Sequence, residues 1–161
     1  MKTATTRNIA LSADGSAVRI IDQTLLPGEL RYLELRTREE LYEAIHALRV
    51  RGAPAIGIFA AYALYVLARG YGQADFLPRL DADCDHLISC RPTAVNLSWA
   101  LNRMEQVVKD HPEASIPEIR ELLKKESEEI KAEDVWMCRS IGEYGLTLIK
   151  DGDGILTHCN A

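Results

Sequence analysis

The sequence predicts an α+β fold in which a small antiparallel sheet packs on a helical domain. Two β-rich runs, VRII and LRYLEL, lie within the first 36 residues, and the segments ADGS and LPGE supply the residues that turns require. After residue 36, apolar residues recur at helical spacing instead. We therefore expect the sheet and the helical domain to occupy residues 1–150, and residues 151–161 to begin a second domain.

A capping box opens the first predicted helix. Thr37 stands three residues before Glu40, and this pair can satisfy the free backbone N–H groups of a first helical turn. We expect this helix to end near Arg51 and Gly52. The apolar residues that follow the cap at helical spacing are Leu41, Ala44, Ile45 and Leu48.

The second predicted helix has Pro54 in its first turn, where proline is tolerated, and stops by Gly70. It is apolar on nearly every side, which is typical of a helix surrounded by its neighbours. The run from Ala53 to Ala68 carries no charge, but it is shorter than the roughly 18–20 residues that cross a bilayer. We interpret it as a core helix.

Three further helices complete the helical domain. One precedes Arg91, another runs from about Thr93 to Lys109, and the last extends from a capping box at Ser115 to about Ile149. We expect Gly142 and Gly145 to bend or interrupt the last helix, and the acidic stretch DADCD at 81–85 to be a solvated helix face. The inward positions of the first two are Leu80, Cys84, Leu87, Ile88, Leu97, Leu101, Met104 and Val108.

Composition narrows the class of partner. The chain has 161 residues, of which 47% are hydrophobic, so it is long enough for a real core. It carries 24 acidic and 19 basic residues, a net charge of −5, and no run of five or six like charges, which argues against a nucleic-acid or membrane surface. The N-terminal residues lack the apolar segment of a signal peptide. We expect a cytoplasmic protein whose partner is a small molecule.

The last residues, DGDGILTHCNA, predict a turn and then a strand over residues 155–159. A buried parallel strand needs hydrogen-bonding neighbours on both sides, and the sequence after Ala161 supplies none. We therefore expect this sequence to be truncated.

Arg51 and Arg91 both stand just before predicted helices and are candidate anion ligands. The first N–H groups of a helix have no internal partner, and Gly52 and Ala53 would let an anion approach them closely. A guanidinium adds a planar fork of donors that matches phosphate or carboxylate. If the two helix starts lie side by side, both arginines can hold one phosphate. The alternative is that each arginine pairs with a surface carboxylate.

Cys159 is the candidate catalytic side chain. It stands at the carboxyl end of the last predicted strand, and ligands bind beyond such ends in open α/β sheets. The alternative is that this thiol is a small buried hydrophobe. His158 points to the opposite face of a strand, and the four histidines show no metal-ligand spacing, so no metal site is expected.

Three motifs resemble those of the methylthioribose-1-phosphate isomerase family in order and separation: RGAPAIG at 51–57, RPTAVNLSWAL at 91–101 and GDGILTHCNA at 152–161. The resemblance extends over essentially the whole chain, and the series is more specific than any one motif. It implies that Arg51, Gly52, Ala53 and Arg91 contact the phosphate and sugar, and that Cys159 is the active-site cysteine.

The resemblance also implies that residues 151–161 are the start of a Rossmann-like domain. An aspartate acid/base, a glutamine and an Asn-Lys pair beyond Ala161 would complete the site. The implied reaction converts 5-methylthioribose 1-phosphate to methylthioribulose 1-phosphate in methionine salvage, with no metal or organic cofactor. The full-length protein would be a homodimer, and the present chain alone would be inactive.

Other functions remain open at this point. Ribose-1,5-bisphosphate isomerases and the regulatory subunits of eukaryotic initiation factor 2B share the implied fold. The chain could therefore belong to a related sugar-phosphate isomerase, to a regulatory protein that binds a sugar phosphate or partner subunits without turnover, or to a purely structural helical domain.

Overall fold

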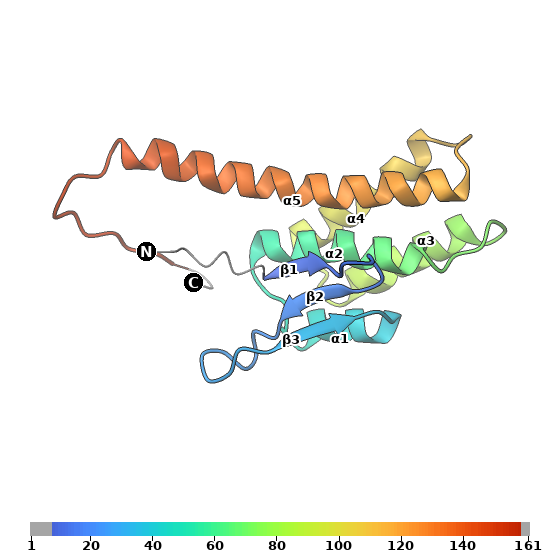
Figure 1. Cartoon of the computed structure of the whole chain (residues 1–161), viewed down its shortest axis with the longest axis horizontal. Coiled ribbons are helices and arrows are strands. Elements are labelled where there is room, and N and C mark those ends of the chain that lie inside the picture. Colours follow the sequence, from blue (N-terminus) through green and yellow to red (C-terminus); the bar gives the residue numbers. More distant parts are fainter. Residues whose placement is uncertain (1–7, 159–161) are drawn as a thin grey trace.

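A three-stranded antiparallel sheet opens the fold in the computed structural model, which describes residues 8–158 (Figure 1). The strands are β1 (Ile9–Leu11), β2 (Val18–Ile21) and β3 (Tyr32–Leu35), in the order β1-β2-β3. Ile20 of β2 pairs with Ile9 on one side and with Leu33 on the other. The predicted sheet is confirmed.

Within the described residues five helices follow the sheet, and the longest runs along one side of the domain, at the top of Figure 1. This arrangement confirms the α+β prediction of a small sheet on a helical domain. The helices are α1 (Arg38–His46), α2 (Ala53–Ala68), α3 (Phe76–Ser89), α4 (Val95–Asp110) and α5 (Ile116–Leu146).

Helix α2 forms the centre of the core, as its all-round apolar sequence predicts. It packs against α1, α3, α4, α5 and strands β1 and β2, and most of its side chains are buried. Its first turns lie against α4, where the Asn96 side-chain amide donates a hydrogen bond to the Ala53 carbonyl (2.8 Å). A Cβ on Gly57 would lie 2.8 Å from the Asn96 carbonyl oxygen, so only glycine allows this close approach.

Both predicted capping boxes form. The Thr37 side chain accepts from the backbone N–H of Glu40 at the start of α1, and Ser115 forms the same arrangement with Glu118 at the start of α5. Of the inward positions predicted for α3 and α4, all are buried except Ile88, which is half-buried.

The prediction for the end of α1 is wrong, because the helix stops at His46 rather than near Arg51. The chain reverses at Leu48, which has a positive φ of 60° and is exposed. The backbone N–H of Val50 then donates to the Ala44 carbonyl (3.1 Å), and Val50 fills the core position predicted for Leu48. The loop between α1 and α2 is therefore longer than the sequence suggests.

The interpretation of the acidic stretch at 81–85 is wrong for Asp83, which is buried. Its carboxylate accepts hydrogen bonds from the Tyr71 hydroxyl and from the Arg38 guanidinium. Burial, followed by the bond to Asp83, raises the pKa of Tyr71, so its hydroxyl keeps the proton that it donates. Asp83 thus joins α1 to α3 instead of facing solvent.

Helix α5 ends at Leu146, slightly before the predicted Ile149, and it continues unbroken through Gly142 and Gly145. Residues 155–158 are exposed and form no strand, although the sequence predicts one over 155–159. A strand is defined by hydrogen bonds to a neighbour, and none of the described residues pairs with this segment.

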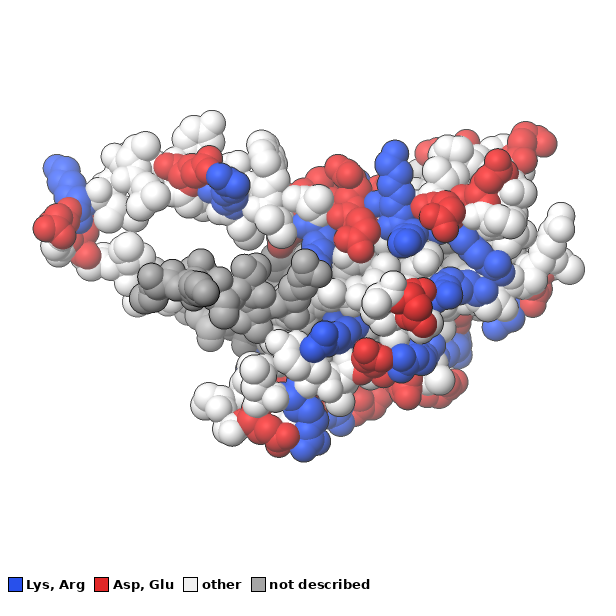
Figure 2. All heavy atoms as spheres, viewed as in Figure 1, with Lys and Arg blue, Asp and Glu red and all other residues white. Residues whose placement is uncertain are grey.

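No helix among the described residues is both long enough and apolar enough to span a bilayer. Basic and acidic side chains are mixed over the face shown in Figure 2. Several charged side chains are paired, and Arg103 on α4 contacts both Glu126 and Glu133 on α5.

Two glycine-to-alanine substitutions are expected to have opposite effects on stability, because Gly57 lies at the close contact of α2 with α4 and Gly142 lies in open space on α5. Gly57→Ala forces a methyl group against backbone and is expected to lower the free energy of unfolding by about 1–3 kcal/mol. Gly142→Ala in α5 meets nothing within 4 Å and is expected to raise it by up to about 1 kcal/mol, since alanine favours a helix. Urea unfolding measures both values, and a stable Gly57→Ala variant would contradict the packing described.

Candidate functional site

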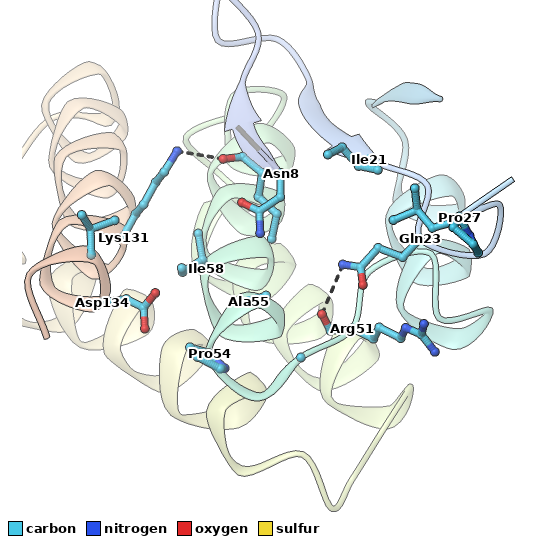
Figure 3. A pocket seen from close by; sticks show the side chains of 14 residues that line it. Asn8, Ile21, Gln23, Pro27, Arg51, Pro54, Ala55, Ile58, Lys131 and Asp134 are labelled. Atoms are coloured by element: carbon cyan, nitrogen blue, oxygen red, sulfur yellow. Dashed lines mark hydrogen bonds between the residues drawn. The ribbon is translucent and has the colours of Figure 1, made fainter. Parts of the chain in front are cut away.

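An open cavity of about 780 Å³ lies between the sheet, the start of α2 and the middle of α5 (Figure 3). Gln23 and Arg51 stand at one end, and Lys131 and Asp134 stand at the other. The lining residues are Asn8, Ile9, Ile21, Gln23, Leu26, Pro27, Arg51, Gly52, Pro54, Ala55, Ile58, Lys131, Asp134 and Val135.

The start of α2 forms the middle of this cavity. Gly52 precedes the helix with a φ of 109°, a backbone conformation that favours glycine, and no side chain caps the first turn. The leading N–H groups of the helix, at its positive dipole end, are therefore free of side-chain acceptors. This arrangement suits an anion.

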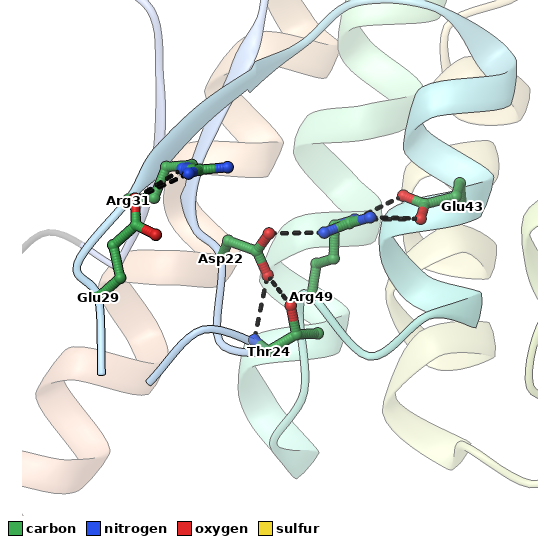
Figure 4. Close-up of polar contacts among 6 residues, drawn as sticks. All are labelled: Asp22, Thr24, Glu29, Arg31, Glu43 and Arg49. Carbon is green, nitrogen blue, oxygen red and sulfur yellow. Dashed lines mark hydrogen bonds and ion pairs between the residues drawn. The ribbon is translucent and has the colours of Figure 1, made fainter. Parts of the chain in front are cut away.

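The loop that carries Arg51 is held from the sheet side (Figure 4). Arg49 donates to Asp22 (2.6 Å) and also to Glu43 on α1 (2.8 Å). Gln23 reinforces the link, because its backbone N–H donates to the Arg49 carbonyl (3.0 Å) and its side-chain amide to the Arg51 carbonyl (3.3 Å). The backbone before Gly52 is therefore fixed at several points.

Asp22 is the buried member of this network. Burial alone would raise the pKa of its carboxyl group, but hydrogen bonds from Thr24 and Arg49 outweigh burial and hold the pKa below its usual value. The carboxylate is therefore charged at neutral pH and holds the Arg49 guanidinium in place.

Lys131 and Asp134 approach the cavity from α5. The Lys131 ammonium group donates to the Ile9 carbonyl (2.7 Å) and so ties α5 to β1. Burial raises the pKa of Asp134, and no other described residue forms a hydrogen bond or ion pair with its carboxyl group. This carboxyl group is thus a polar group that a ligand in the cavity can reach.

Neither Arg51 nor Arg91 pairs with a carboxylate in the described part of the chain, so the alternative of simple surface ion pairs is not observed. Arg51 is exposed and lines the cavity. Arg91 is half-buried in the turn between α3 and α4 and does not line this cavity. The starts of α2 and α4 do lie side by side, but convergence of the two guanidinium groups stays a prediction.

Cys159 lies outside the described residues, so its proposed role also stays a prediction. The other thiols on α3 and at its end are poor nucleophiles, because burial raises the pKa of Cys84 and raises that of Cys90 to about 11. Within residues 8–158, no three His, Cys, Asp or Glu side chains gather as a metal site would require.

Sequence reasoning missed Gln23, Lys131 and Asp134 as lining residues. Lys131 and Asp134 lie in a charge-rich stretch of α5 that resembles an ordinary solvated face. Their spacing of three residues puts them on one side of the helix, and this was the only available signal.

Known proteins match both the sequence and the fold. The profile described as "Initiation factor 2 subunit family" matches residues 49–161. A methylthioribose-1-phosphate isomerase from Symbiobacterium thermophilum is 54% identical over 95% of the chain and 44% of its own length. A 5-deoxyribose 1-phosphate isomerase from Bacillus thuringiensis is 47% identical over 90% of the chain and 43% of its own length.

A crystal structure of 5-methylthioribose 1-phosphate isomerase from Pyrococcus horikoshii has a similar fold, with a TM-score of 0.85 at 36% identity over 91% of the chain and 41% of that structure. These matches confirm the resemblance seen in the three motifs. The chain spans less than half the length of each of these relatives.

The network around Asp22 predicts a pH-dependent contribution to stability. Asp22→Asn is expected to lower the free energy of unfolding at pH 7 by about 1–3 kcal/mol, because the charge-assisted bond to Arg49 is lost. The folded-state pKa is depressed, so this contribution is full above the ordinary aspartate pKa of about 4 and disappears as the pH falls through the lower folded value.

The control is Glu29→Gln, which removes an exposed pair with Arg31 (Figure 4) and is expected to change stability by less than about 1 kcal/mol. Chemical unfolding at several pH values makes the comparison. A difference between wild type and Asp22→Asn that persists unchanged in acid would show that the Asp22 charge does not act as described.

Proposed function

The chain belongs to the initiation factor 2 subunit family, and from this membership and the cavity at α2 we propose that it forms part of a sugar-phosphate isomerase. The substrate is 5-methylthioribose 1-phosphate and the product is methylthioribulose 1-phosphate. The observation that carries the proposal is the uncapped start of α2, with Gly52 and Arg51 at a cavity of about 780 Å³. This geometry offers backbone N–H donors and a guanidinium to one phosphate group.

The phosphate site determines what the rest of the site must do. A phosphate on C1 prevents spontaneous ring opening, so the enzyme must deliver a proton to the ring oxygen as the bond from C1 to that oxygen breaks. Hydrogen then moves from C2 to C1, and the C2 hydroxyl group gives up its proton to become the ketone. Atoms and electrons balance, so the reaction requires no external oxidant or reductant.

In this proposal Arg51, Gly52, Ala53 and Arg91 hold the phosphate and sugar, and Cys159 stabilises the reacting carbons. The acid/base group comes from residues that this chain does not include. Support comes from the relatives, which are about twice as long and are named as isomerases of 1-phosphorylated pentoses. We expect residues 1–161 alone to show no turnover.

The last turns of α5 are the proposed contact surface for that additional length of chain. Trp136, Ile141 and Tyr144 are each about 70% exposed, at 68%, 71% and 77%. Large apolar side chains gathered on one surface mark a contact site in soluble proteins.

A regulatory protein that binds a sugar phosphate without turnover is the second candidate, because the matched family is named for an initiation factor. Incubation of the full-length protein with 5-methylthioribose 1-phosphate, followed by NMR, separates the two. A ketose signal supports the isomerase. Binding of the sugar phosphate without a ketose signal supports the regulatory protein.

Removal of either arginine is expected to weaken substrate binding. Arg51→Ala or Arg91→Ala in the full-length protein raises KM by about 10- to 100-fold, because each charge-assisted contact contributes about 1.5–3 kcal/mol. Arg36→Ala is the control, since the Arg36 guanidinium pairs with the exposed Glu34 and does not line the cavity. Unchanged KM values in both site variants would exclude this phosphate site.

Cys159→Ser in the full-length protein is expected to lower kcat by about 100-fold or more, the usual effect of losing a group that acts in the transition state. Cys138→Ser is the matched control, because Cys138 is an exposed cysteine on α5. Circular dichroism and thermal unfolding verify that both variants fold. Wild-type turnover in Cys159→Ser would remove the cysteine from the mechanism.

A further inference from the structure

A second cavity, of about 240 Å³, lies on the other side of the start of α2, between α4 and α5. Pro54, Ile58 and Asp134 line both this cavity and the first, so the two are neighbours along one surface. We infer that this second cavity binds the apolar 5-end of the sugar phosphate. The inference rests on the proposed function, which it deepens by assigning a specificity site.

The walls of the second cavity are mostly apolar. Ile58 comes from α2, Val95 and Trp99 from α4, and Ile130 and Met137 from α5. Trp99 and Met137 are about half-exposed, at 46% and 48%, so a ligand that covers them removes apolar surface from water.

Two of the polar groups around the cavity already have partners, whereas the Asp134 carboxyl group, which lines both cavities, has none among the described residues. The Asn96 amide donates to the Ala53 carbonyl, and Glu133 forms a two-pronged contact with Arg103. The Arg103 guanidinium also lies over the Trp99 ring, 5.5 Å from its centre. The indole is therefore held as one wall, and no unpaired charge of Glu133 faces the cavity.

The substrates of the relatives have one charged end and one apolar end, which fits an anion site in the first cavity and apolar walls in the second. The relatives act, by name, on methylthioribose 1-phosphate and 5-deoxyribose 1-phosphate, which share a 1-phosphate and lack a 5-hydroxyl group. With the phosphate at Arg51 and Gly52, the sugar extends along Pro54 and Ile58, and its 5-end reaches the apolar walls. A thioether sulfur also makes favourable contacts with an aromatic ring, which Trp99 supplies.

The test compares two substrates in the full-length protein. Wild type is expected to favour 5-methylthioribose 1-phosphate over ribose 1-phosphate by about 10-fold or more in kcat/KM, the usual effect of one small apolar group in an apolar pocket. Trp99→Ala is expected to lower kcat/KM for the methylthio substrate by about 10-fold and for ribose 1-phosphate by less than about 2-fold. Trp99→Phe retains most of the preference.

The matched control is Leu77→Ala, which removes an exposed apolar side chain of α3 that lines neither of these two cavities and leaves the preference unchanged. Circular dichroism verifies folding of all variants. If Trp99→Ala lowers both substrates equally, or changes neither, the 5-end does not bind at Trp99 and the inference is wrong, although the isomerase activity stands. If wild type converts neither substrate, the proposed function itself fails and the inference fails with it.

Discussion

The guanidinium of Arg49 joins the sheet to the helices at the point where the candidate site is built. It contacts Asp22 at the end of β2 and Glu43 on α1, so this side chain links the sheet to α1. The loop between α1 and α2 depends on this contact, because it has no regular structure of its own. The position of Gly52, and with it the direction in which α2 begins, therefore depends on the ion pair between Arg49 and the buried carboxylate of Asp22.

Helix α2 then serves two purposes. Its middle is buried on all sides and forms the core, whereas its first turn is open to solvent between two cavities. Gly57 has no side chain, so α4 can approach α2 closely at this point. This close approach brings Trp99 of α4 beside the start of α2. The close packing that stabilises the domain is thus also what places a polar cavity and an apolar cavity next to each other.

The parts of the fold that were predictable from sequence depend on contacts between residues near each other in the chain. The capping boxes at Thr37 and Ser115, and the proline in the first turn of α2, are of this kind. The role of Asp83 could not be predicted, because its partner Arg38 is 45 residues away and the acidic stretch around it resembles a solvated face. The early end of α1, at a positive φ on Leu48, also carried no glycine signal in the sequence.

The candidate site divides in the same way. Arg51 and Gly52 were found because glycine and arginine before a helix form a local signal, whereas Asp134 reaches the cavity only through the packing of α5 on α2.

The proposed function depends above all on phosphate binding at the start of α2. Backbone amide chemical shifts of the full-length protein, titrated with 5-methylthioribose 1-phosphate, test this claim directly. It predicts that the amides of Gly52, Ala53 and Ala55 shift most and that Arg51→Ala weakens the response. Saturable shifts confined to residues away from the start of α2, unchanged by Arg51→Ala, would contradict it.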